Sequence, residues 1–184
     1  MLSCFLSALI VVIGQFSVSG TVTDANDRSP LSEAVVSVEK DGRTGAISTD
    51  PENHDKMCRL RAEKVARIPV PDVEVQGCVD DAELLIVGFG GTYGHLHSAM
   101  DEMVATGKKV ALAHFSYLNP LPANTAEVLK RYKKVVVAEQ NLGQFAAYLR
   151  MKVDGFVPYQ FNQVKGQPFV VSELVAAFTE IYNK

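Results

Sequence analysis

The stretch from which the fold can be predicted is Glu83-Leu-Leu-Ile-Val-Gly-Phe-Gly-Gly-Thr-Tyr-Gly94. Its apolar run, Leu84 to Val87, leads into four glycines within seven residues, and a helical pattern follows at once. A buried strand, a tight turn and a helix N-terminus form the opening unit of an α/β layer. Such a turn is also a place where a nucleotide-type anion would bind.

Strand and helix patterns alternate from this unit to the C-terminus. Gly107 is expected to end the first helix, and Ser172 is expected to cap the last. The predicted strands cover 84–87, 109–114, 134–138 and a short segment near 155–161, and the predicted helices cover 92–105, about 126–132, 141–151 and 171–182. Short strands without charged residues in their interiors, separated by helices, predict a three-layer α/β fold with a parallel sheet and helices on both faces.

The pattern before residue 83 predicts a helix followed by a linker or an edge segment of the sheet. Asp50 and Pro51 open a helix as N-cap and first residue, and the helix runs to about Ile68. Its lysines and arginines form either a solvated face or a docking surface for an acidic partner or a phosphate. Residues 69–81 read as a linker or an edge segment. The predicted domain organisation is therefore 1–38, 39–82 and 83–184.

Residues 1–38 differ from the rest of the chain. An apolar leader over 2–13 has the length of a signal-peptide core but lacks a positive n-region. Two β-branched runs follow, with Pro30 and Leu31 between them, and predict two short strands. The pattern of Val18, Gly20, Val22 and Asp24, continued to Val38, resembles the start of a carboxypeptidase-regulatory-like β module found in outer-membrane receptors.

Composition limits the classes of function. The net charge of −3 and the pI of about 5.8 argue against non-specific nucleic-acid binding. No apolar run has the length of a membrane span. The three cysteines have no metal-binding spacing, so no metal site is predicted. We expect a cytoplasmic protein, with export as the alternative if residues 1–20 act as a signal peptide.

The glycine-rich turn is a candidate cofactor-binding site. Gly88, Gly90 and Gly94 depart from the dinucleotide-binding spacing, and no acidic residue follows the second strand. The alternative is that the glycines allow strand, turn and helix to pack closely. The cofactor-binding candidates in this turn are Gly88, Gly90, Gly91, Thr92 and Gly94.

Other candidates lie where the later strands end, because ligands bind at the carboxyl ends of parallel strands in this architecture. His114 and Asn119 follow the second strand, and Glu139, Asn141 and Gln144 follow the third. These five are candidates for contact with a partner or ligand, although Asn141 equally suits a helix cap. The sequence contains no convincing nucleophile with its base and no paired carboxylates, so no catalytic residue is predicted.

Five segments resemble the α-subunit of 2-oxoacid:ferredoxin oxidoreductases, most nearly the 2-oxoglutarate enzymes. They occur in the order of that family, within residues 39–184, and are Thr44-Gly-Ala-Ile-Ser-Thr-Asp-Pro-Glu-Asn-His54, Leu85–Gly94, Tyr117-Leu-Asn-Pro-Leu-Pro122, Glu139-Gln-Asn-Leu-Gly-Gln144 and Gln163-Val-Lys-Gly-Gln-Pro-Phe169. The resemblance implies a transketolase C-terminal-like domain whose first strand–helix corner is the glycine turn.

The resemblance also implies a function. The whole enzyme oxidatively decarboxylates a 2-oxoacid to an acyl-CoA, with thiamine diphosphate, an iron–sulfur cluster and CoA as cofactors and ferredoxin as acceptor. The β-subunit carries the diphosphate and the cluster, so this chain is expected to bind no cofactor alone, to be inactive alone, and to act as a structural, subunit-binding part. Residues 1–38 do not match, which suggests a chimeric or mis-joined reading frame with its seam near residues 38–41. The alternatives are a stand-alone nucleotide- or CoA-binding domain and an exported protein.

Overall fold

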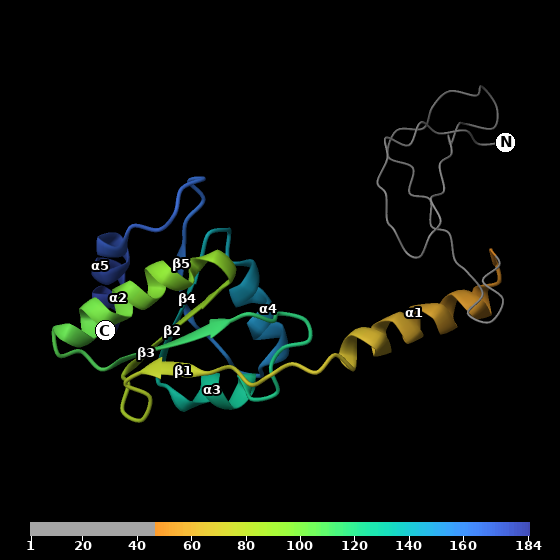
Figure 1. Cartoon of the computed structure of the whole chain (residues 1–184), viewed down its shortest axis with the longest axis horizontal. Coiled ribbons are helices and arrows are strands. Elements are labelled where there is room, and N and C mark those ends of the chain that lie inside the picture. The colour runs from red at the N-terminus through yellow and green to blue at the C-terminus, as the bar shows by residue number, and fades with distance from the viewer. Residues whose placement is uncertain (1–46) are drawn as a thin grey trace, which may run out of the picture. The chain divides into compact units, whose positions relative to one another are not determined.

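The computed structural model describes residues 47–184 (Figure 1). The apolar leader and the two short strands expected within residues 1–38 lie outside the described residues. The chain divides into two compact units, Met1–Arg61 and Ala62–Lys184. The second unit contains the whole α/β layer. Among residues 47–184, no helix has the length and apolar character needed to cross a membrane.

The helix α1 spans Pro51–Ala66. Its N-terminus is capped as predicted, since Asp50 Oδ1 accepts a hydrogen bond of 3.1 Å from the backbone N–H of Glu52. Ion pairs of the i, i+4 type, Arg59 with Asp55 and Arg67 with Glu63, lie along the helix and its C-terminal end. None of the residues of α1 is buried.

A five-stranded sheet forms the centre of the second unit. Its strands are β1 (Val75–Gly77), β2 (Leu84–Phe89), β3 (Val110–Phe115), β4 (Lys134–Glu139) and β5 (Tyr159–Asn162). The spatial order is β1-β3-β2-β4-β5. The four strands from β2 onward run parallel, whereas β1 is antiparallel to β3.

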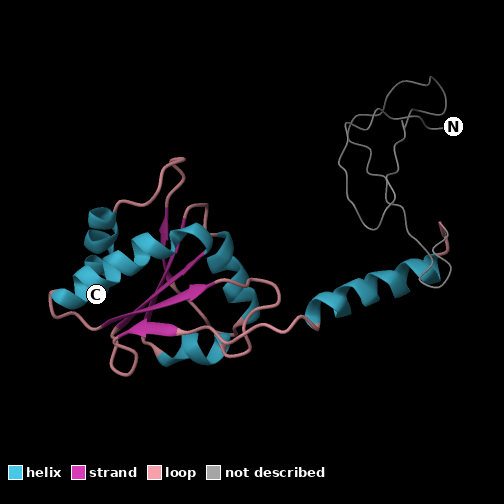
Figure 2. Ribbon diagram, in the orientation of Figure 1, coloured by secondary structure: helices cyan, strands magenta, loops and turns pink. Residues whose placement is uncertain are grey.

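Two helices cover each face of the sheet (Figure 2). The helices α2 (Tyr93–Ala105) and α5 (Val171–Tyr182) share one core with alternate strand residues such as Leu84 and Ile86. The helices α3 (Thr125–Arg131) and α4 (Gln144–Lys152) share the other core with Leu85 and Val87. Both faces of the central strands are therefore buried, which explains their continuous apolar runs.

The α/β fold with helices on both faces is confirmed, and the four predicted strands run parallel; the additional edge strand β1 is antiparallel, so the whole sheet is mixed. The chain passes from β1 to β2 through only six residues, 78–83, without a helix that would return it to the other end of the sheet. A short connection reverses the chain direction, so β1 runs against its neighbours. The edge alternative for residues 69–81 is confirmed for β1, which extends the sheet before residue 83.

The starts of α2 and α4 differ from the predictions, and one predicted cap is not formed. Residues Gly90–Thr92 form a 3₁₀ turn, and α2 begins only at Tyr93. The helix α4 begins at Gln144, not at residue 141. The predicted cap by Ser172 is wrong, because Val170 occupies the N-cap position of α5 and Ser172 lies inside the helix. Gly107 follows α2 with φ of +83°, as predicted for a helix-ending glycine.

Candidate functional site

The carboxyl ends of β2, β3 and β4 lie at one edge of the sheet. The β2–β3 register pairs Gly88 with His114 and Phe89 with Phe115, so the glycine turn and the end of β3 are direct neighbours. The loop after β4, which begins at Gln140, lies on the other side of β2. Parallel pairing thus brings the three predicted candidate segments to the same edge.

The glycines of the turn have different structural roles. A Cβ at Gly88 would collide with Leu96 Cδ1 and lie 3.0 Å from Thr92 Oγ1, so the close packing of β2 against α2 requires glycine there. Gly90 has φ of +61°, a conformation that favours glycine. A Cβ at Gly91 or Gly94 would meet no atom within 4 Å. The packing interpretation therefore holds for Gly88 and does not extend to Gly91 and Gly94.

Thr92 stabilises the turn itself. Its hydroxyl donates a hydrogen bond of 2.8 Å to the backbone carbonyl of Phe89, and its side chain is buried. The hydroxyl hydrogen is therefore used within the turn and is not available to a ligand. A cofactor-binding role for the turn remains a prediction. The exposed backbone of Gly90 and Gly91 is the part of the turn that a cofactor could contact.

His114 is half-buried at the end of β3, where its Nε2 is inaccessible and makes no hydrogen bond among the described residues. The ring of Tyr93 packs edge-on against it, with 5.1 Å between the ring centroids. Burial lowers the pKa of His114 below its usual 6.5, and hydrogen bonding to the backbone of Gly90 and Phe89 opposes this shift. The imidazole is therefore neutral at pH 7.

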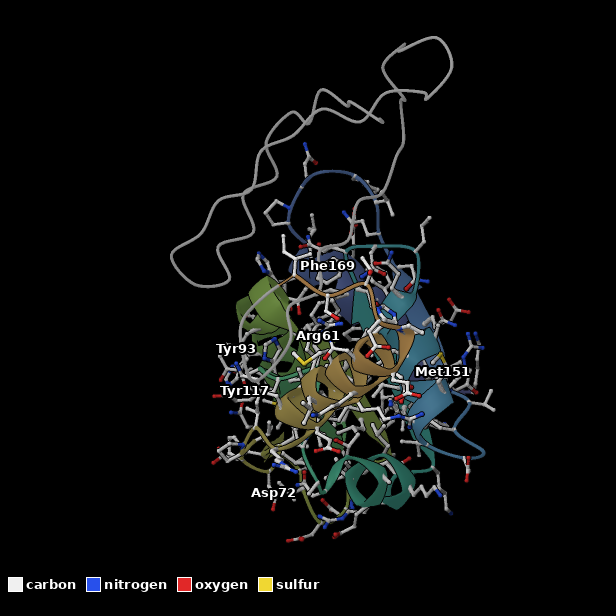
Figure 3. The ribbon with its side chains drawn as sticks, turned by 90° about the vertical axis from the view of Figure 1, so that its right-hand side faces the viewer. Arg61, Asp72, Tyr93, Tyr117, Met151 and Phe169 are labelled. Carbon is white, nitrogen blue, oxygen red and sulfur yellow. The ribbon has the colours of Figure 1, made fainter. Side chains whose placement is uncertain are left out.

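A cleft of about 490 Å³ opens beside His114. Its walls come from three places in the sequence: the segment leading into β1, the first residue of α2, and the chain that follows β3. The lining residues are Pro71, Asp72, Val73, Glu74, Gln76, Tyr93, His114, Phe115, Ser116, Tyr117 and Pro122. Figure 3 shows Tyr93 and Tyr117 on the same side of the molecule.

Glu139 and Asn141 form a cap for α4. The carboxylate of Glu139, which has no exposed surface, accepts hydrogen bonds from the backbone N–H groups of Phe145 (2.7 Å) and Ala146 (2.9 Å). Asn141 Oδ1 accepts hydrogen bonds from the N–H groups of Gly143 (2.8 Å) and Gln144 (3.0 Å). The capping alternative for Asn141 is confirmed, and both side chains are used within the fold.

The remaining candidates, Gln144 and Asn119, have exposed side chains. The side chain of Gln144 is exposed at the first residue of α4. Asn119 is exposed after β3, where its Oδ1 lies 3.5 Å from the hydroxyl of Tyr148. Within residues 47–184, no hydrogen bond or ring contact joins His114, Asn119 and Gln144 to one another, and their contact roles stay predictions.

Sequence reasoning missed the acidic and aromatic walls of the cleft. Asp72 and Glu74 belong to a segment read as a linker or edge, and they reach the end of β3 because β1 pairs with it antiparallel. Tyr93 belongs to the glycine-rich stretch, in which only the glycines and Thr92 are predicted as site residues. The alternation of apolar Val73 and Val75 with acidic Asp72 and Glu74 was the available signal for an edge strand beside a site.

The described residues offer no set of side chains for a metal or cluster. Within 47–184, no group of three or more His, Cys, Asp or Glu side chains is placed to hold a metal ion. Cys58 is exposed and Cys78 half-buried, and both are free thiols. The acidic cleft does not fit the phosphates of a nucleotide or CoA either, since carboxylates repel them.

The architecture defines an open-sheet α/β domain, covered by helices on both faces, with its polar loops at the carboxyl edge. Residues 82–173 match the family model for the pyruvate:ferredoxin oxidoreductase core domain II. The chain belongs to this family.

Relatives of known type support the same assignment. The chain is 44% identical over 161 residues to the 2-oxoglutarate oxidoreductase subunit KorA of Mycobacterium tuberculosis, covering 87% of this chain and 23% of that protein. It is 31% identical over 145 residues to the 2-oxoacid:ferredoxin oxidoreductase 1 subunit alpha of Aeropyrum pernix, covering 74% of this chain and 23% of that subunit. The predicted resemblance to these α-subunits is confirmed, and the chain spans about a quarter of their length.

A solved structure agrees with the sequence relatives. The 2-oxoglutarate:ferredoxin oxidoreductase of Magnetococcus marinus, solved with 2-oxoglutarate, coenzyme A and succinyl-CoA bound, superimposes with a TM-score of 0.68 at 25% identity. The match covers 91% of this chain and 33% of that chain. The fold is thus that of a part of a larger oxidoreductase chain.

Proposed function

We propose that this chain supplies the core domain II part of a 2-oxoacid:ferredoxin oxidoreductase α-subunit, most nearly one that acts on 2-oxoglutarate. The observation that carries the proposal is the 44% identity to the KorA subunit over 161 residues. The reaction would be oxidative decarboxylation of the 2-oxoacid to an acyl-CoA with ferredoxin as acceptor. Thiamine diphosphate, the iron–sulfur cluster and CoA would be held by the whole cytoplasmic assembly.

The role of this chain within the assembly would be structural and partner-binding. The described residues support this role because they leave large apolar side chains in solvent. The three most exposed of these are Val157 (85%), Leu142 (84%) and Met151 (76%). Leu142 precedes α4, Met151 lies in its last turn, and Val157 lies between α4 and β5. Figure 3 shows Met151 at the outer surface. We propose that this group contacts the β-subunit.

The test is co-purification of the full chain with its partner from the native source. We expect recovery of a β-subunit that carries thiamine diphosphate and an iron–sulfur cluster. Val157→Glu should reduce recovery of the partner at least about tenfold, since a charge buried in an apolar contact costs more than 1.4 kcal/mol. Val104→Glu, the same substitution on α2, is the matched control. Recovery of the chain without any such partner would contradict the proposal.

The second candidate is a stand-alone domain that binds a nucleotide or CoA at the glycine turn. The open space above Gly91 and Gly94, next to the start of α2, is the observation that favours it. Binding of CoA to the purified chain, with loss on Gly90→Val, would support this candidate. Gly90→Val is informative because a branched residue is strained at φ of +61°.

The N-terminal residues carry a separate proposal. We propose domain boundaries near residues 38 and 82, with a mis-joined reading frame as the origin of the part of residues 1–38 that lies outside the 161-residue match. Peptide mapping of the native protein tests the boundary. Peptides that cross residues 30–50 in one frame would contradict the mis-joined frame, and a mature N-terminus near Gly20 would favour export.

A further inference from the structure

The cleft beside His114 is built into the fold. Asn124 holds its outer wall by two hydrogen bonds to the backbone of Val73: Oδ1 accepts from the N–H (2.9 Å) and Nδ2 donates to the carbonyl (3.0 Å). The ladder with β3 begins only at Val75, so the chain over 71–74 is fixed by a side chain in place of a strand partner. This arrangement leaves the space at the end of β3 open.

The walls of the cleft carry negative charge only. Asp72 and Glu74 are exposed, and no lysine or arginine is among the lining residues. With neutral His114, the lining has a formal charge of −2 at pH 7, one from each carboxylate. Within residues 47–184, neither carboxylate lies within ion-pair distance of a basic side chain. Their negative charge is therefore available to a cation from outside.

Aromatic rings provide the other walls. Tyr93 is held in place by ring contacts with His97 (5.4 Å between centroids) and His114 (5.1 Å), and its hydroxyl donates a hydrogen bond of 3.1 Å to Gln76 Oε1. Tyr117 is 47% exposed on the same side of the molecule (Figure 3). A fixed tyrosine and an exposed tyrosine beside two carboxylates form the surroundings that a planar cation prefers.

We propose that this cleft binds the guanidinium group of an arginine from a basic segment of a partner protein. The guanidinium would stack on the tyrosine rings and donate hydrogen bonds to the carboxylates, in which it differs from the point charge of lysine. The volume of about 490 Å³ accommodates an arginine with its neighbouring residues. The inference concerns the chemistry of one cleft and goes beyond the identity of the assembly.

The test is an NMR titration of the full 184-residue chain with N-acetyl-arginine amide. We expect saturable shifts at the backbone amides of Glu74 and Tyr117 and at the His114 ring. N-acetyl-citrulline amide has the same shape without the charge, and it should bind about threefold to tenfold more weakly because the cation–π and ion-pair contributions are lost.

Substitutions separate the contributions of the acidic and the aromatic side chains to arginine binding. Asp72→Asn with Glu74→Gln, and separately Tyr117→Ala, should each weaken arginine-amide binding about threefold or more. All three residues are exposed, so the fold should be kept, which the unchanged dispersion of the spectrum will show. Asp154→Asn, an exposed carboxylate outside the cleft, is the control.

Two results would overturn the inference. One is equal binding of the arginine and citrulline amides. The other is a larger response of the same resonances to inorganic pyrophosphate, which would make the cleft an anion site. Neither result bears on co-purification with a β-subunit, so failure of this inference and failure of the proposed function remain distinguishable.

Discussion

Glu139 shows how a single charged side chain is used inside the fold. A carboxylate with no exposed surface is costly unless its oxygens are hydrogen-bonded. Here each oxygen accepts one backbone N–H from the first turn of α4, where the helix dipole also favours negative charge. The residue is thus a structural anchor between the end of β4 and the start of α4.

Replacing Glu139 should destabilise the protein strongly. Glu139→Ala leaves two buried N–H groups without partners, so we expect a loss of about 2–4 kcal/mol in the free energy of unfolding. Urea denaturation followed by circular dichroism measures the change. Gln144→Ala, an exposed residue of the same loop, should change stability by no more than about 0.5 kcal/mol. Equal losses in the two variants would show that the carboxylate does not anchor the helix.

His114 predicts a pH dependence of stability. Its folded pKa lies below the unfolded value of 6.5, so between these two values the unfolded state binds more protons and stability rises with pH. Stability should therefore be lost as the pH falls through 6.5 and should level off below the folded pKa. Urea midpoints between pH 5 and 8 for the wild type and His114→Asn isolate this contribution, with His95→Asn as control. Parallel curves for wild type and His114→Asn would contradict it.

At the scale of elements, the contact of β2 with α2 depends on Gly88. Adding one methyl group there forces Leu96, which is fully buried, to move. The segment over 71–74 depends in the same way on a single side chain, Asn124. In both cases one contact decides the position of an element relative to its neighbour; the contact lies between elements close together in the chain for Gly88 and spans 51 residues for Asn124.

Two glycine-to-alanine substitutions should have opposite effects. Gly88→Ala overpacks the interface and should destabilise by about 1–3 kcal/mol. Gly94→Ala lies in α2 with open space around it, and should stabilise by about 0.5–1 kcal/mol because alanine is the better helix former. Thermal unfolding measures both. If Leu96→Ala fails to relieve the effect of Gly88→Ala in the double variant, the collision is not its cause.

At the scale of the whole molecule, the exposed helix α1 and the α/β layer should differ in their resistance to proteolysis. None of the residues of α1 is buried, whereas the α/β layer buries both faces of its sheet. Within residues 47–184, trypsin should therefore cut first after Arg59, Arg61, Lys64 or Arg67, because cleavage needs local unfolding of exposed chain. Intact mass spectrometry should show lasting fragments that end at Lys184. Early cleavage within 84–139 would contradict this assignment of stability.

Features that depend on neighbours in the chain could be predicted, and features that depend on long-range contacts could not. The apolar runs of Leu84–Val87 and β4 predict buried strands, and Asp50 and Asn141 predict helix caps. These signals depend only on neighbours in the chain. The direction of β1, the start of α2 at Tyr93 and the missing cap at Ser172 could not be read in this way. The direction of β1 depends on its pairing with β3, which is distant in sequence.

The sequence by itself determined the α/β class, the order of its strands along the chain and the family, since apolar periodicity and long matching segments are properties of the chain alone. Only the tertiary structure decided that Glu139 is an anchor for α4 and that Asp72, Tyr93, His114 and Tyr117 border one cleft. For the cleft, the physical reason is the antiparallel pairing of β1 with β3, which brings residues some 40 positions apart to the same edge of the sheet.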